Sequence, residues 1–169
     1  MRQLLSVLVI LSLLGSTQWA TAENSIINWE ADDPKMQAAV SSAQDTLDKF
    51  FQHAIDENQK ALPSASLKVA FAVDAPDATD ELIWVSDFKH LADGRLIGKL
   101  ANDPEFMRDM AYNSEVNFSP SQIVDWSFLG ADQKAYGHFT TRVLLSGASK
   151  DQAQAIMEIL SENKIPADW

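Results

Sequence analysis

Residues 116–142, VNFSPSQIVDWSFLGADQKAYGHFTTR, form the stretch on which the fold assignment rests. At its centre, Asp125 and Trp126 follow an apolar pair, which predicts a core strand over residues 122–129 that also presents an acidic group. An acid beside a large aromatic residue can serve the fold or a ligand. Both interpretations are therefore kept open.

Upstream of this stretch, apolar spacing predicts one long helix. Asp33 and Pro34 have the residue types of an N-cap and a first helical position. The apolar residues from Met36 to Ala54 recur at three- and four-residue spacing, which is typical of one buried helical face. Pro63 sets the latest end of this helix.

Four strands are expected between this helix and the central stretch, because apolar residues there alternate with polar or small ones. Asp93 and Gly94 predict a tight antiparallel hairpin between the second and third strands. Gly98, within an apolar strand, predicts a bulge or a close approach of two backbones. The four predicted strands cover residues 67–73, 81–88, 95–101 and 114–118.

Further helices are expected around and after the last strands. Residues 102–104 predict the start of a short helical segment that extends to about residue 111. Residues 138–146 suit either a strand or a helix, and we favour a short helix. Ser149 and Gln152 form a capping box for a final helix.

Helices that lie outside a run of strands, instead of alternating with them, predict an α+β protein. We expect a mostly antiparallel five-stranded sheet or a small, partly open barrel. A long N-terminal helix and a C-terminal helix should flank it.

The first 22 residues have the features of a secretory signal peptide. Arg2 is followed by an apolar run over residues 4–14 and by an Ala-x-Ala cleavage site ending at Ala22. We therefore expect Sec-type export to the periplasm or secretion, with an extended lead-in over residues 23–32 and a single domain over 33–169. After removal of the signal peptide, no membrane association is expected.

The chain is strongly acidic, with 24 Asp and Glu against 13 Lys and Arg and a formal net charge of −11. Such a surface repels nucleic acid and anionic lipid, so a basic protein or a small ligand is the expected partner, and no nucleic acid. The chain contains no cysteine, so an exported protein of this kind would rely on its core instead of disulfides.

No pattern of nucleophile, metal ligands or cofactor-binding residues is present, so no cofactor and no metal are expected. Of the three histidines, only His138 lies in the central stretch, where it could act as a base or serve the structure. Glu81 and Asp125 each lie close to a tryptophan in sequence, and as a carboxylate pair they could do acid–base work if they faced one cleft.

Two further pairings are suggested by residue type. Arg142 lies in an apolar run, and an arginine there usually needs a partner, so we expect a salt bridge to Asp125 that pins the final helix to the sheet or serves a site. Trp84 and Trp126 could form an aromatic platform for a sugar or peptide, or could belong to the core.

An ordered series of short motifs resembles the YegJ-like family of bacterial proteins, a domain of unknown function. The resemblance implies one compact α+β domain, often exported, with no reaction to carry over. The matching motifs are Asp33-Pro34-x-Met36, Glu81-x-x-Trp84, Asp93-Gly94, Gly98-x-Leu100-x-Asn102-x-Pro104, Ile123-x-Asp125-Trp126 and Gly137-x-Phe139-Thr140-x-Arg142. The candidate ligand or partner site drawn from these motifs and from His138 is Glu81, Trp84, Asn102, Asp125, Trp126, His138, Thr140 and Arg142.

Two hypotheses for function follow. The leading one is an exported, acidic, non-enzymatic binding or interaction protein, such as an inhibitor that neutralises a basic partner. The alternative is a small periplasmic hydrolase that uses Asp125 or Glu81 with His138 and Arg142. The second hypothesis requires these side chains to converge on one open pocket.

Overall fold

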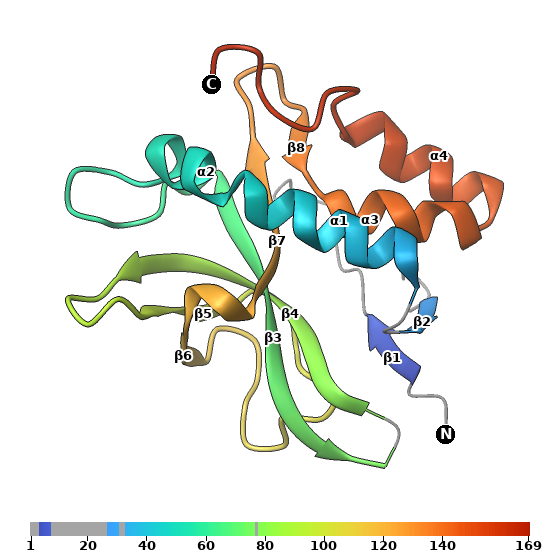
Figure 1. The fold of residues 1–169 in the computed structure, drawn as a ribbon, viewed down its shortest axis with the longest axis horizontal. Helices are drawn as coiled ribbons and strands as arrows, with labels where there is room; N and C mark the ends of the chain where they lie inside the picture. The colour runs from blue at the N-terminus through green and yellow to red at the C-terminus, as the bar shows by residue number, and fades with distance from the viewer. Residues whose placement is uncertain (1–3, 8–26, 31–32, 77) are drawn as a thin grey trace, which may run out of the picture.

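The computed structural model describes residues 4–7, 27–30, 33–76 and 78–169 (Figure 1). In this part of the chain, six strands form one antiparallel sheet in the order β6-β5-β4-β3-β7-β8, which confirms the α+β class and the antiparallel pairing. The strands are β3 (Ala65–Ala75), β4 (Ala78–His90), β5 (Leu96–Leu100), β6 (Glu115–Phe118), β7 (Ile123–Leu129) and β8 (Ala135–Gly137).

The expectation of five strands was wrong because β8 was missed. This three-residue strand pairs with residues 127–129 of β7 after a tight turn in which Gly130 donates its N–H to the carbonyl of Lys134. A strand this short carries too few residues to show a period of two. Its pairing depends on β7 and not on its own sequence.

Within the described residues there are four helices, two before the first strand of this sheet and two after its last strand. They are α1 (Pro34–Asp45), α2 (Leu47–Ala54), α3 (Phe139–Leu144) and α4 (Lys150–Ile159), with short 3₁₀ turns η1 (Pro120–Gln122) and η2 (Leu145–Gly147). In Figure 1, α1 runs beside α3, and α4 follows α3 at the same side of the molecule. The short helix favoured for residues 138–146 and the capping box at Ser149 are both confirmed.

The N-terminal helix is not one long helix, because it breaks at Thr46. The Thr46 hydroxyl bonds to the carbonyls of Ser42 and Ala43 in the preceding turn. It also accepts the indole N–H of Trp126 at 3.0 Å. Threonine that bonds back to its own helix competes with the regular ladder, and here a long-range bond holds it in place.

The register of β3 with β4 and β7 places apolar side chains on one face of the sheet and a group of polar and aromatic side chains on the other. Leu67 lies opposite Val85 and Trp126, and these apolar residues are fully buried in the main core. The next residue, Lys68, lies opposite Trp84 on β4 and Asp125 on β7. Because successive strand residues point to opposite faces, Lys68, Trp84 and Asp125 share the face opposite Trp126.

The helical segment predicted after residue 102 is wrong. Residues 101–114 form a connection of turns and bends between β5 and β6, which we call the β5–β6 loop. Its expected capping residues are engaged elsewhere, since Asn102 accepts the backbone N–H of Trp84 and Asp103 accepts that of Tyr112. Tertiary bonds therefore override the local helix signal.

The C-terminal helix buries less than its apolar pattern predicts. Within α4 no residue is buried, and Met157 is 63% exposed. The end of the chain is held instead by Trp169, whose ring lies 5.7 Å from that of Trp126 and 4.8 Å from that of His53.

The predicted signal peptide and lead-in fall mostly outside the described residues. Two short stretches there are described, as strands β1 (Leu4–Val7) and β2 (Ile27–Glu30), which pair antiparallel with each other. The predicted cleavage point after Ala22 lies outside the described residues. No helix in the described part of the chain is both long and apolar enough to cross a membrane.

Candidate functional site

Asp125 is the centre of a buried polar network. Its carboxylate accepts the backbone N–H groups of Phe139 and Thr140 at 3.0 and 2.8 Å, and the Thr140 hydroxyl at 2.6 Å. It also accepts the N–H of Trp126 at 2.8 Å, and it is 0% exposed. Four donors thus satisfy this carboxylate, which fixes the start of α3 against the edge of β7.

This arrangement follows from the path of the chain after β8. β8 leaves the ladder at Gly137, and the N–H of His138 still reaches the carbonyl of Trp126. His138 then adopts a left-handed conformation with φ 53°, and α3 begins. This turn places the first N–H groups of α3 beside Asp125, which immediately precedes Trp126 in β7.

Lys68 belongs to the same network, although its place in an alternating strand does not predict this. It is 1% exposed, its Nζ donates to the Thr140 hydroxyl at 2.9 Å, and it lies 4.8 Å from the centre of the Trp84 ring. Burial lowers the pKa of the Lys68 ammonium, and the Asp125 carboxylate opposes that change. Thr140 thus connects the buried side chains of Lys68 and Asp125.

His138 lies against this cluster as a neutral ring. Burial, with the nearby charges of Lys68 and Arg142, lowers its pKa to about 3. Its Nδ1 lies 3.4 Å from the Thr141 hydroxyl, and its ring lies 5.1 Å from that of Trp84. A histidine that stays neutral to such a low pH does not exchange protons as a base near neutral pH.

The predicted salt bridge between Asp125 and Arg142 is wrong. Arg142 donates from Nε to the carbonyl of Gly137 at 3.0 Å and from Nη2 to that of Ser161 at 2.8 Å. Thr140 and Arg142 are two positions apart on one helix, so their side chains point about 200° apart. Arg142 therefore ties α3 to the segment after α4 through backbone carbonyls.

The aromatic platform of Trp84 and Trp126 is also wrong. Their registers with Lys68 and Leu67 put the two rings on opposite faces of the sheet. Both tryptophans are buried. They are core residues in two separate environments.

Glu81 and Asn102 form a second buried polar group, which shapes the β5–β6 loop. The Glu81 carboxylate accepts the backbone N–H groups of Glu105 and Phe106, one on each oxygen. Asn102 accepts the N–H of Trp84 at 3.1 Å through its side-chain oxygen. Both side chains thus bind the loop to β4.

The loop held in this way presents an acidic and apolar surface. Tyr112 is 64% exposed and Met110 is 39% exposed, which makes them two of the four large apolar side chains exposed in the described residues. Glu105 and Asp109 are exposed beside them. In Figure 1 the loop lies at the same end of the sheet as the end of β3 and the start of β4.

The comparison with known proteins identifies the family. Residues 33–159, from α1 through α4, match the family of uncharacterized proteins conserved in bacteria, DUF2314. The chain belongs to this family. It is also 30% identical over 156 residues to the uncharacterized protein YegJ of Escherichia coli (strain K12), which covers 89% of this chain and 94% of that protein. No solved structure matches the chain significantly.

These matches confirm the YegJ-like resemblance. Both describe uncharacterized proteins, so they indicate no activity for this DUF2314 protein. The predicted site residues do not converge on one point. Asp125, Thr140 and His138 belong to the network that fixes α3, while Glu81 and Asn102 fix the β5–β6 loop. Among the described residues, each of these two groups is bound by its own neighbours, and nothing in their geometry supports the hydrolase hypothesis.

The described residues hold no cluster of three or more His, Cys, Asp or Glu side chains placed to bind a metal ion.

The residues that sequence reasoning missed are Lys68, Met110 and Tyr112. A lysine in an alternating strand is normally assigned to the solvent face, so Lys68 gave no signal. Met110 and Tyr112 were missed because residues 102–111 carry a local helix signal; in the structure they lie in a connection of about 14 residues without a helix or strand, a length at which loops are often functional.

Proposed function

We propose that this DUF2314 protein is exported and acts as a non-enzymatic binding protein that presents the β5–β6 loop to a basic protein. The observation that carries this proposal is the loop itself. It combines exposed Tyr112 and Met110 with exposed acids, and the buried carboxylate of Glu81 holds its backbone in place.

The composition of the loop suits recognition. Tyrosine and methionine are enriched in protein interfaces, and buried tyrosines often carry much of the binding energy. A loop that is already fixed by Glu81 and Asn102 loses little conformational freedom when it binds. Such a loop is expected to bind its partner in its existing conformation, without folding upon binding.

The charge of the chain supports a basic partner. The formal net charge is −11, and loss of the predicted signal peptide would remove Arg2 and make it −12. At the loop end of the sheet, Asp74 and Asp80 of the β3–β4 hairpin add to Glu105 and Asp109. Opposite charge on a partner would accelerate encounter, most strongly at low ionic strength.

Export is supported by the apolar N-terminal run and its Ala-x-Ala site. A fusion of the full-length chain to a reporter that is active only outside the cytoplasm tests it. Reporter activity should be lost when two arginines are placed in the apolar run over residues 4–14. Equal activity with and without the arginines would contradict export by this route.

The binding proposal is tested with immobilised protein and periplasmic extract at low and high salt. A captured basic protein is then purified, and its affinity is measured for the wild type, Tyr112→Ser and the double variant Glu105→Gln with Asp109→Asn. We expect weaker binding for Tyr112→Ser, and slower association with less salt dependence for the double variant.

A matched control removes the same charge elsewhere. Asp151→Asn with Glu162→Gln neutralises two exposed acids in and after α4, on the other side of the molecule. This control should bind with the wild-type salt dependence. Absence of any basic partner, or equal losses in the loop and control variants, would refute the proposal.

A further inference from the structure

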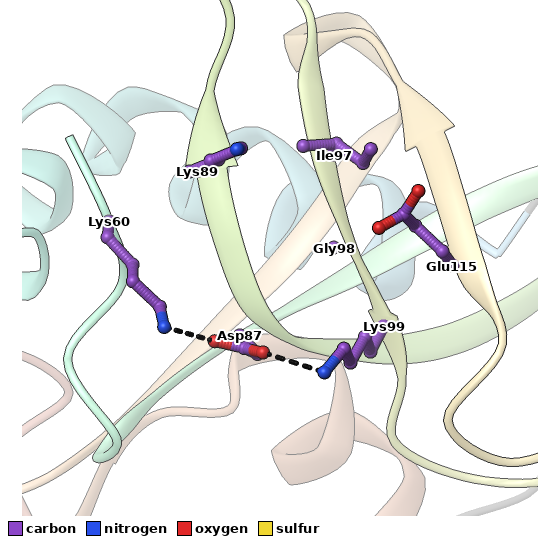
Figure 2. A pocket seen from close by; sticks show the side chains of 7 residues that line it. All are labelled: Lys60, Asp87, Lys89, Ile97, Gly98, Lys99 and Glu115. Carbon is purple, nitrogen blue, oxygen red and sulfur yellow. Dashed lines mark ion pairs between the residues drawn. The ribbon is translucent and has the colours of Figure 1, made fainter.

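A shallow depression of about 190 Å³ lies on the outer face of β4, β5 and β6 (Figure 2). It is separate from the buried networks and from the exposed surface of the β5–β6 loop. Lysines are concentrated there, although acids outnumber basic residues almost two to one in the chain. Its lining residues are Lys60, Asp87, Lys89, Ile97, Gly98, Lys99 and Glu115.

The depression is created by a bulge in β4. Ser86 pairs with Lys99 and Lys89 pairs with Ile97, so three steps along β4 correspond to two along β5. The bulge contains Asp87, whose backbone has a left-handed φ of 50°. The bulge brings Asp87 and Lys89 to the same outer face as Ile97 and Lys99.

One carboxylate in the depression already joins two lysines. Asp87 lies 3.0 Å from Lys60 Nζ through one oxygen and 3.1 Å from Lys99 Nζ through the other. Bonds to Lys60 and Lys99 lower the pKa of Asp87. This triad holds the wall of the depression and uses both oxygens of Asp87.

Two charges of opposite sign remain at the rim. Within the described part of the chain, the side chains of Lys89 and Glu115 have no ion-pair or hydrogen-bond partner. In Figure 2 they lie on either side of Ile97 and Gly98, and the Glu115 carboxylate turns toward the depression. Gly98 contributes only backbone here, since its missing side chain would point toward Val85 in the core.

We propose that this depression binds a small zwitterion, a free α-amino acid, with its carboxylate on Lys89 and its ammonium on Glu115. An anion alone would be attracted by Lys89 and the neighbouring lysines but repelled by Glu115. A ligand with both charges satisfies both rim groups, and Ile97 between them offers an apolar contact for a short side chain.

The volume of the depression, about 190 Å³, favours a small ligand. This space is smaller than the roughly 300–1,000 Å³ of sites for drug-sized ligands. An amino acid such as alanine or valine fits it, whereas a nucleotide does not.

The proposal is tested by titrating the ¹⁵N-labelled protein with L-alanine and recording amide shifts. We expect saturable shifts at Ile97, Gly98 and Lys99. N-acetyl-L-alanine, which lacks the positive charge, and L-alaninamide, which lacks the negative charge, should each bind at least about tenfold more weakly, as the loss of one charge-assisted bond implies.

Two variants assign the contacts. Lys89→Met should weaken L-alanine binding at least about tenfold, and Glu115→Gln should do the same while removing the preference for L-alanine over N-acetyl-L-alanine. Lys150→Met, an exposed lysine at the start of α4, is the control and should bind like the wild type. Amide spectra of all three variants establish that they fold.

Several results would overturn the proposal. They are the absence of saturable shifts with L-alanine, equal binding of L-alanine and N-acetyl-L-alanine by the wild type, and equal losses in Lys150→Met. Inorganic phosphate that displaces L-alanine and binds independently of Glu115 would identify a simple anion site instead. None of these results bears on the β5–β6 loop, so the partner proposal stands or fails separately.

Discussion

The carboxylate of Asp125 accepts both the backbone N–H and the hydroxyl of Thr140, at 2.8 and 2.6 Å, with no exposure to solvent. One side chain thereby fixes the start of α3 to β7. Asp125 therefore anchors α3 to the sheet, and removal of its carboxylate tests this role directly.

Asp125→Ala should destabilise the fold by about 3–5 kcal/mol, because it leaves three buried N–H groups and the Thr140 hydroxyl without their acceptor and removes the negative charge near Lys68. Urea unfolding followed by tryptophan fluorescence measures the loss. Asp125→Asn, which keeps one acceptor oxygen in nearly the same shape, should lose less. A stability within 1 kcal/mol of wild type for the alanine variant, a bound set by the usual worth of one hydrogen bond, would contradict the anchor role.

Lys68→Met should be tolerated far better, with a change of no more than about 1.5 kcal/mol in unfolding free energy. Asp125 keeps its four donors in this variant, and methionine fills the space of the buried lysine chain beside Trp84. A loss as large as that of Asp125→Ala would mean that the cation, and not the N–H donors, holds the network together.

Gly137→Ala should cost more than about 2 kcal/mol of stability, because its backbone has φ 74° and a Cβ there would lie 2.1 Å from the carbonyl oxygen of Trp126. Gly147→Ala is the matched control, since nothing lies within 4 Å of a Cβ at that position. Thermal unfolding of both variants measures the difference. Equal changes would show that the turn at Gly137 can relax.

Neutral His138 should make stability depend on pH in a defined window. In the unfolded chain this ring takes up a proton near pH 6.5, whereas in the folded protein its pKa is about 3. Its contribution is therefore fully present above pH 6.5 and is lost as the pH falls toward 3, by up to about 1.4 kcal/mol per pH unit.

His138→Asn removes this titration and suits the left-handed backbone at φ 53°. The difference in unfolding free energy between wild type and variant, measured by urea titration from pH 7.5 to 4.5, should shrink as the pH falls. A difference that is constant over this range would show that His138 ionises equally in the folded and unfolded states.

Features that depend only on residues close together in the chain could be predicted from the sequence. The hairpin at Asp93-Gly94 and the capping box at Ser149 are local, and both are present. The close approach predicted at Gly98 is also confirmed, since a Cβ there would lie 3.1 Å from the backbone oxygen of Ser86, next to the bulge in β4. In each of these cases the cause lies in a short segment or in the size of one residue.

Features that depend on distant partners could not be predicted. The break at Thr46 requires the indole of Trp126, 80 positions later, and the β5–β6 loop requires Glu81. The candidate site shows the same limit: Glu81, Asn102, Asp125 and Thr140 come from the motifs that resemble the YegJ-like family. That selection finds buried polar residues, and only the register of the sheet reveals what each one holds.

The most direct test of the account is hydrogen exchange of the protein, free and bound to its captured basic partner. We expect added protection in residues 101–114, at the end of β3 and at the start of β4, with no change in α3. Protection confined to α3 and β7, around Asp125 and His138, with none in the loop, would contradict it.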